Sequence, residues 1–502
     1  MPPDLLIEGY AHPHRIPVQI NKIIVDTLEP AWRRNVLAFE LLGKAAKGLS
    51  DAPIEKLLDR RFASGHIDEQ LLRRLGTAAV IEGDPVLSRK KQRVRYWASY
   101  FADYETQADI GIEQPSNWLA SHPRIRTAIR RIEHWTMRAG LDGIKEKVLV
   151  FGTYTAPLRC LRDCLNARSL LRQIGNGLPA RRGGLSLELI RYELQQMVEE
   201  GVAPSALAHL RMGELDVRLI EAAKSWERLR QNLAATITDD WVCDEMRISD
   251  RRADSISTVT EYAREHVIFD ALAQGENPAT SPEERKSRAK GVLKALIAAQ
   301  SGYGEDREAE DIQSAESMLD RITALISSER SPEGDAGGHV SHASSTPAVY
   351  LGGGVSAVSQ RLIQARFNEK NSNPTVLICQ SVVGREGLNL HKACRVVLLF
   401  HPEWNPAVVE QQIGRVDRIG SRWEKLATAW RENGGEPEEF PRIVVEALCF
   451  SGTYDEYQTD QLNRRMAELK AQLFGEFASD IEVSDEVSEI LREKGIDFSP
   501  RR

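Results

Sequence analysis

Two short apolar runs, joined by a loop that contains glycine, constrain the fold of this chain more than any other feature. Residues 376–379 and residues 396–400 are apolar throughout and are bounded by polar residues. Apolar runs without alternation are typical of strands that are buried on both faces. A helix is expected after the second run, because Asn405 can cap it and Pro406 fits its first position. This order of elements predicts an α/β domain.

The expected helix carries a group of polar residues with regular spacing. Residues three and four apart share one face of a helix, so Gln411, Arg415 and Arg418 are expected to project together. Gly414 would allow another backbone or a ligand to approach closely. Two guanidinium groups and an amide on one face suit a polyphosphate. A solvated arginine-rich helix would show the same spacing, so the spacing alone leaves both interpretations open.

Three segments of this region resemble motifs of superfamily 2 helicases, in the Swi/Snf-like branch and its bacterial RapA-like relatives. The segments, in the order and spacing of that family, are Gly384-x-Glu386-Gly387-Leu388-Asn389-Leu390, Trp404-Asn405-Pro406 and Gln411-x-x-Gly414-Arg415-x-x-Arg418-Ile419-Gly420. Two positions depart from the family: His401 stands where an acidic residue is usual, and Ser421 where a glutamine is usual. The resemblance implies the second RecA-like domain of a nucleic-acid-dependent ATPase.

The resemblance also implies roles for individual residues. Arg418 would be the arginine finger on the γ-phosphate of ATP, and Arg415 its companion. The residues expected to bind ATP are Gln411, Gly414, Glu386, Gly387 and Asn389. The residues expected to face nucleic acid are Ser381, Thr153 and Thr155. A helix cap between a strand and a helix would explain the threonines equally well.

The sequence signals of a first RecA-like domain are not found. That domain should supply a phosphate loop, Gly-x-x-x-x-Gly-Lys-Ser/Thr, and a Mg²⁺-binding Asp-Glu pair after a strand. Residues 43–44, a Gly-Lys pair, lack both the earlier glycine and the following hydroxyl residue. The Asp-Glu pairs at 68–69 and 244–245 do not follow a strand-like run. ATP is therefore expected as a cofactor together with Mg²⁺, whose ligands would come from the missing domain.

Three explanations of this half-site are open: a partner polypeptide, a longer product of which this chain is a fragment, or a motor that has lost its activity. We expect the C-terminal half of a helicase or translocase that supplies motifs IV to VI and is not active alone. The alternative is a non-catalytic scaffold, derived from a helicase, that binds nucleic acid or protein. Arg415 and Arg418 are both present, which argues against complete decay.

The family elements that precede this region are widely separated along the chain. Residues 147–151 read as the first strand of the domain, whereas the next family element begins at residue 349. The residues between them show apolar stripes at helical spacing, so they predict a helical insertion that buries its own core and can be removed. The expected parts are a helical N-terminal region (1–140), a RecA-like parallel-sheet domain split over 141–165 and 346–475, an all-helical insertion (166–345) and a polar tail (476–502).

Composition limits the partners and the compartment. The formal net charge is −7, so any surface that binds nucleic acid must be a local patch. The resemblance implies DNA in preference to RNA as that partner. The sequence shows no membrane span and no signal-peptide pattern at its start, which favours a cytoplasmic protein without a membrane partner. Cys160 and Cys164 have no second pair at metal-ligand spacing. No metal site is expected in this chain, and the cysteines are expected to be reduced.

Overall fold

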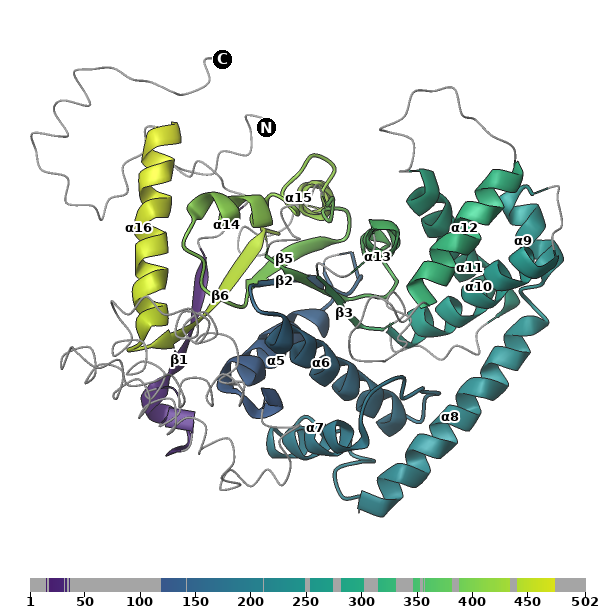
Figure 1. The fold of residues 1–502 in the computed structure, drawn as a ribbon, viewed down its shortest axis with the longest axis horizontal. Helices are drawn as coiled ribbons and strands as arrows, with labels where there is room; N and C mark the ends of the chain where they lie inside the picture. The colour runs from purple at the N-terminus through teal and green to yellow at the C-terminus, as the bar shows by residue number, and fades with distance from the viewer. Residues whose placement is uncertain are drawn as a thin grey trace, which may run out of the picture.

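A six-stranded parallel sheet lies at the centre of the described part of the chain. The computed structural model describes residues 15, 18–30, 32–33, 36, 119–140, 142–210, 212–248, 253–273, 281–301, 315–330, 346–352, 355, 357–381, 388–433 and 440–474. The strand order is β1-β6-β5-β2-β4-β3, and each neighbouring pair is parallel. Helices lie on both sides of the sheet (Figure 1). The predicted α/β fold with a RecA-like parallel sheet is confirmed.

The central strands are buried on both faces, as the apolar runs predicted. The strands are β1 (Gln19–Ile24), β2 (Lys147–Gly152), β3 (Ala348–Leu351), β4 (Val376–Gln380), β5 (Cys394–Leu399) and β6 (Val444–Ser451). Alternate residues of β2 face opposite sides, so Leu149 and Phe151 enter one core while Val148 and Val150 enter the other. A strand covered in this way must be apolar at every position, which is why it shows no alternation.

Each face of the sheet is covered by its own set of helices. One face packs against α5 (Pro123–Thr136) and α6 (Thr155–Gly175). The other face packs against α13 (Ala357–Asn368), α14 (Pro406–Ile413), α15 (Arg422–Glu432) and α16 (Tyr454–Phe474). Two short 3₁₀ helices, η2 (Val25–Thr27) and η4 (Leu119–Ser121), complete this part. The second face is the one that carries the predicted ATP-binding residues.

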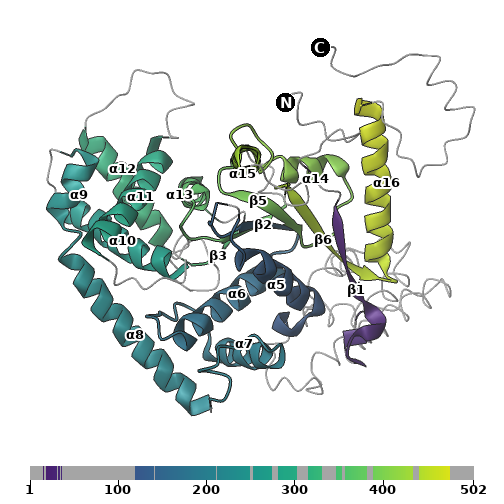
Figure 2. The same cartoon turned by 180° about the vertical axis from the view of Figure 1, so that it is seen from behind.

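The described residues of the predicted insertion form six further helices. They are α7 (Leu187–Glu199), α8 (Met212–Ala234), α9 (Asp239–Met246), α10 (Ala253–Ala273), α11 (Pro282–Ser301) and α12 (Ala315–Arg330). Helix α8 runs along the margin of the molecule and links α7 to the group formed by α9 to α12 (Figure 2). The buried stripe of α8 is shared accordingly: Leu215 packs with α6 and α7, and Trp226 with α9 to α12.

The insertion leaves the sheet domain and returns to it at neighbouring points, but its hydrophobic core includes a residue of the sheet domain. The Asn166 side chain bonds to both the carbonyl and the N–H of Ala348, so the two ends of the excursion meet. Leu362 of α13 nevertheless belongs to the core of α9 to α12. The insertion and the sheet domain therefore share buried surface, which the helical periodicity did not indicate.

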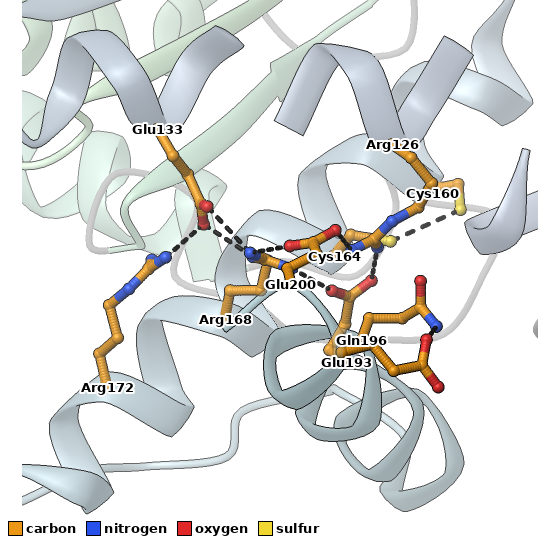
Figure 3. A network of polar contacts seen from close by, with 10 residues as sticks. Arg126, Glu133, Cys160, Cys164, Arg168, Arg172, Glu193, Gln196 and Glu200 are labelled. Carbon is orange, nitrogen blue, oxygen red and sulfur yellow. Dashed lines mark hydrogen bonds and ion pairs between the residues drawn. The ribbon is translucent and has the colours of Figure 1, made fainter. Parts of the chain in front are cut away.

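A buried ionic network joins the first insertion helix to the sheet domain. Helices α5 and α6 supply the arginines and one glutamate, and α7 with the residue after it supplies the other two glutamates (Figure 3). Arg168, whose side chain is 1% exposed, contacts Glu133 at 2.8 Å and Glu200 at 2.7 Å. Arg126 contacts Glu193 at 2.7 Å. The network comprises Arg126, Arg168, Arg172, Glu133, Glu193 and Glu200.

The N-terminal region contributes a strand as well as helix, which was not expected from the sequence. Strand β1 pairs with β6 from Gln19 opposite Glu446 to Ile24 opposite Ser451. Its sequence mixes polar and apolar residues, only Ile23 is buried, and it lacks the apolar run of the central strands. In the same region α5 is capped by His122, whose Nδ1 accepts from the N–H of Arg124 at 3.2 Å.

The described residues contain neither a candidate metal centre nor a membrane-spanning helix. No group of three or more His, Cys, Asp or Glu residues is placed to hold a metal ion among the residues that the structure describes. The Sγ atoms of Cys160 and Cys164 lie 4.0 Å apart on α6, beside the ionic network. Among these same residues, no helix combines the length and the apolar character needed to cross a bilayer.

Candidate functional site

Polar residues gather where β2, β4 and β5 end. The N–H of Thr153, after β2, donates to His401 Nδ1 at 3.1 Å, and His401 follows β5. The N–H of Ser381, after β4, donates to the carbonyl of Gly152 at 2.7 Å. The carboxyl ends of parallel strands meet at one edge of the sheet, where α/β domains bind ligands. The three chain segments that leave this edge are thus held together by direct bonds.

The structure brings the three residues predicted to face nucleic acid to this edge, with different exposure. Thr153 is exposed, whereas Ser381 is 4% exposed and accepts a bond from Gln412 at 3.4 Å. Thr155 is the first residue of α6 and accepts from the hydroxyl of Tyr350 at 3.4 Å. The cap of α6 is Tyr154, without a side-chain bond, so neither threonine acts as the helix cap.

Helix α14 starts as predicted and ends earlier than predicted. The Asn405 side chain accepts from the N–H of Ala407 at 2.9 Å, and Pro406 is the first helical residue. The helix ends at Ile413, so Arg415 and Arg418 lie on the turn that follows, not on its face. The prediction that they share a helical face with Gln411 is therefore wrong. Gln411 itself is exposed on α14.

The turn formed by residues 414–420 is tied to residues 388–391, which precede β5. The N–H of Leu390 donates to the carbonyl of Arg415 at 3.2 Å, and the N–H of Arg422 donates to the carbonyl of His391 at 2.7 Å. Gly414 is needed for packing rather than for backbone conformation, since a Cβ there would lie 3.1 Å from the carbonyl oxygen of Glu410. The long-range bonds to 388–391 replace the helical bonds that would have continued α14.

The turn places both predicted catalytic arginines next to Asn389. Arg418 is exposed and donates to Asn389 Oδ1 and, at 3.1 Å, to the carbonyl of Gly414. Arg415 is buried and its Nη1 lies 3.5 Å from the carbonyl of Leu388. Burial and the nearby charge of Arg418 lower the pKa of Arg415. Glu386 and Gly387, the other predicted residues of this group, lie outside the described residues.

Several cationic side chains lie near His391, beside this turn. Burial lowers the pKa of His391, and the charges of Arg418, Lys392 and Lys425 lower it further. A site in which cations raise the cost of a further positive charge attracts an anion. The arrangement is therefore suited to bind a phosphate group next to Arg418.

The two departures from the helicase family both have structural explanations. His401 is buried and accepts the N–H of Thr153 through Nδ1, so it bridges two strand ends. Ser421 caps α15 by accepting from the N–H of Glu424 at 3.3 Å, and Glu424 in turn accepts from the N–H of Gly420. This capping box fixes the end of the turn that carries the arginines.

Two residues of this region were not singled out by sequence reasoning. Arg15 donates to Glu410 and to Asp417, each at 2.8 Å, and so links α14 to the following turn. The Asn368 side chain donates to the carbonyl of Asn389 at 2.7 Å. Neither could have been found by spacing, because each contacts residues far away along the chain. Asn368 belongs to the segment Arg366-Phe367-Asn368, which resembles part of the family element that begins at residue 349, and this is its one signal in the sequence.

Comparison with known proteins identifies the family of this region. Residues 324–420 match the family model described as helicase conserved C-terminal domain. This region is similar to helicase C-terminal domains. The match includes β4, β5, α14 and the whole turn at 414–420, so it contains both predicted catalytic arginines.

Relatives of the helicase C-terminal domain include proteins of the RapA-like and Swi/Snf-like branch, as the motifs indicated. The RNA polymerase-associated protein RapA of Yersinia enterocolitica is 39% identical over 81 residues, 16% of this chain and 8% of that protein. A DNA repair and recombination protein RAD54-like of Mus musculus is 35% identical over 125 residues, 24% of this chain and 16% of that protein. The matched segments thus cover less than a fifth of these relatives.

A solved structure of the C-terminal part of the Fun30 ATPase domain also matches the chain. It is 14% identical, with a TM-score of 0.18, and the match covers 70% of this chain and 96% of that one. A score of this size supports no conclusion about shared architecture. The assignment of the fold rests on the parallel sheet itself.

Proposed function

We propose that this chain supplies the C-terminal half of a nucleic-acid-dependent ATPase, a helicase or translocase motor. The first RecA-like domain, with its phosphate loop and Mg²⁺ ligands, would come from another chain or segment. The observation that most supports this proposal is the turn 414–420, which presents Arg418 beside Asn389 with further cationic side chains nearby. The family match over residues 324–420 also supports the proposal, because it covers the same turn.

The chemistry follows from how phosphoryl transfer develops charge. In the transition state, negative charge spreads over the oxygens of the transferred γ-phosphoryl group, and a guanidinium can bond two of them. Arg418 is exposed and donates to neutral oxygens, so a phosphate can replace those contacts. The stabilisation is electrostatic and acts when the two domains close. Water would be the acceptor, and ATP bound with Mg²⁺ would be the substrate.

Nucleic acid would contact the carboxyl edge of the sheet. The exposed Thr153 and the neighbouring Thr155 lie at this edge, where hydroxyl and backbone N–H groups can bond to phosphate oxygens. We propose DNA as the substrate in preference to RNA. Closure of the two domains around ATP would then move the protein along the duplex.

The test compares the chain alone with the chain supplemented by a first RecA-like domain. The purified chain should hydrolyse ATP at the background rate, with or without duplex DNA, since it holds only half of the site. Addition of the first domain should give turnover that DNA stimulates. DNA-stimulated turnover by the chain alone, abolished by Arg418→Ala, would contradict the half-site. DNA binding without turnover in the supplemented sample would instead support the scaffold alternative.

A further inference from the structure

A buried carboxylate of the insertion, far from the network of α5 to α7 along the chain, also contacts the sheet domain. Both carboxylate oxygens of Asp270, on α10, accept from Arg366 Nη2, on α13, each at 2.6 Å. It also accepts from the N–H of Asn373 at 3.0 Å. Both side chains of the ion pair are almost completely buried. The insertion therefore holds the end of α13 and the loop after it with a charged group in a dry environment.

Other buried polar groups fix the same end of α13. The carbonyl of Arg366 accepts from the Ser372 hydroxyl at 2.6 Å, and the carbonyl of Phe367 accepts from Lys147 Nζ at 3.0 Å. These bonds satisfy carbonyls that the last turn of a helix leaves without partners. The position of the residue that follows, Asn368, thus depends on contacts that include Asp270.

Asn368 connects this end of α13 to the arginine turn. Its Nδ2 donates to the carbonyl of Asn389 at 2.7 Å, and its Oδ1 accepts from the N–H of Lys392 at 3.1 Å. The two bonds bracket residues 389–392. Within this bracket, the side chain of Asn389 accepts from Arg418. Polar contacts, joined by the backbone of α13 between Arg366 and Asn368, therefore run from Asp270 in the insertion to Arg418.

We propose that the helical insertion controls the position of Arg418 through Asp270, Arg366, Asn368 and Asn389. Asp270 is a positioning residue in this scheme, and its carboxylate lies in the insertion rather than in the sheet domain. A partner that binds the insertion and shifts α10 would move residues 389–392 and hence Arg418. The inference rests on the proposed role of Arg418 for its functional meaning, but the structural link stands independently of ATP turnover.

The physical basis of the link is the cost of leaving a buried charge without its partner. Arg366 and Lys147 are both buried and lie near Asp270, and the charge of Arg366 disfavours a charged Lys147. Loss of the carboxylate would leave Arg366 uncompensated, which a packed core accommodates by a local shift rather than by leaving the charge in place. The shift would be felt first at the last turn of α13, where Asn368 lies.

Hydrogen exchange of the full chain tests the link without nucleotide or a first domain. In Asp270→Asn, amides of residues 388–392 and 414–420 should exchange about two- to thirty-fold faster than in the wild type. Asp270→Glu, which keeps the carboxylate, should restore most of the protection. Asp216→Asn is the matched control, because Asp216 pairs with Arg191 at 2.7 Å within the insertion and does not contact α13 in the described contacts.

The outcomes separate the link from a general loss of stability. A folded Asp270→Asn chain with wild-type exchange at 388–392 would overturn the proposal, as would an equal increase in Asp216→Asn. If Asp270→Asn is recovered unfolded, Arg366→Lys tests the same contact while keeping both charges, with the same faster exchange expected. Faster exchange without any turnover in the supplemented sample would retain the link and reject the proposed ATPase instead.

Discussion

Two groups of arginines in this molecule differ in the groups that their guanidiniums contact. In the network of α5, α6 and α7, Arg126 and Arg168 are surrounded by carboxylates of Glu133, Glu193 and Glu200. In the turn at 414–420, Arg418 donates to the carbonyl of Gly414 and the amide of Asn389. An arginine neutralised by carboxylates serves the fold. One that is held by neutral oxygens keeps its charge for an incoming anion.

The pKa shifts in the two regions differ in the same way as the contacts do. Burial alone would raise the pKa of Glu200, but bonds and charges from Arg126 and Arg168 hold it below its usual value. In the turn, burial and Arg418 lower the pKa of Arg415, so the neighbouring cation repels rather than compensates. The comparison predicts that changes in the network damage stability, whereas changes in the turn damage activity.

Removing the insertion should have the largest effect. Replacing residues 176–345 with a short Gly/Ser linker deletes Glu193 and Glu200, leaves Arg126 and Arg168 with fewer carboxylates and exposes Leu362. We expect insoluble or largely unfolded protein, because buried charges lose their partners and a shared core is opened. Yield in the soluble fraction and circular dichroism would measure this. A soluble product with a cooperative melt would show that the insertion is a separate module, as its helical periodicity suggested.

Arg418→Ala should abolish most turnover and leave the fold intact. With the first domain supplied, we expect a decrease in kcat of about 10³-fold or more, because an arginine finger acts mainly in the transition state. Arg418→Lys should recover little, since an ammonium lacks the planar fork. Steady-state ATP hydrolysis and nucleotide binding would be measured together, with a thermal melt as the check on folding.

The matched control for Arg418→Ala is Arg431→Ala. Arg431 is also exposed and lies in the last turn of the neighbouring helix α15. Its replacement should change neither turnover nor stability. Near wild-type turnover in both variants of Arg418 would show that this residue is not the finger.

Arg168→Ala should lower stability without a direct effect on the phosphate site. Truncating one member of a buried ionic group leaves its partners uncompensated, which costs about 3–5 kcal/mol. Arg230→Ala is the control: Arg230 pairs with Glu227 and Glu261 at the surface of the insertion, and its loss should cost no more than about 1 kcal/mol. Urea unfolding followed by circular dichroism compares the two. Equal losses would mean that burial does not distinguish these arginines.

Lys147→Met should have the smallest effect, which should appear in how the stability of the fold depends on pH. Burial, and then the charge of Arg366, lower the pKa of Lys147 from 10.5 to about 7. Between these values the unfolded chain binds more protons than the folded one, so Lys147 makes stability rise with pH in that window. The variant should lose this rise, and it also loses the bond that Lys147 Nζ donates to the carbonyl of Phe367. Thermal melts from pH 7 to pH 10 measure it, and an unchanged slope would contradict the shift.

Sequence reasoning succeeded where the cause was local. Residues 376–379 and 396–400 were correctly assigned to strands because burial on both faces leaves a continuous apolar run. The start of α14 was correct because Asn405 and Pro406 act on the first turn by themselves. The family of the region was likewise accessible, because its motifs are short and contiguous.

Sequence reasoning failed where the partner is distant. Helix α14 was expected to extend through Arg418, but it ends at Ile413, and the carbonyl of Arg415 accepts from the N–H of Leu390 instead of from a residue one turn further along a helix. The docking of the insertion through Asp270 and Arg366 spans 96 residues and leaves no periodic trace. Whether a charged residue is exposed or buried can be predicted only when its partner is known.

The pairing of β1 with β6 has a consequence for the handling of this domain. Strand β6 has β5 on one side and β1 on the other, so residues 19–24 cover what would otherwise be an open row of backbone N–H and carbonyl groups. A chain shortened to begin at α5 would keep every helicase motif and yet expose that row along most of β6. Open edges of this kind pair with further copies of themselves and nucleate aggregates. Strand β1, in which Gln19, Asn21 and Lys22 are polar, thus replaces the more apolar β6 as the terminal strand of the described sheet.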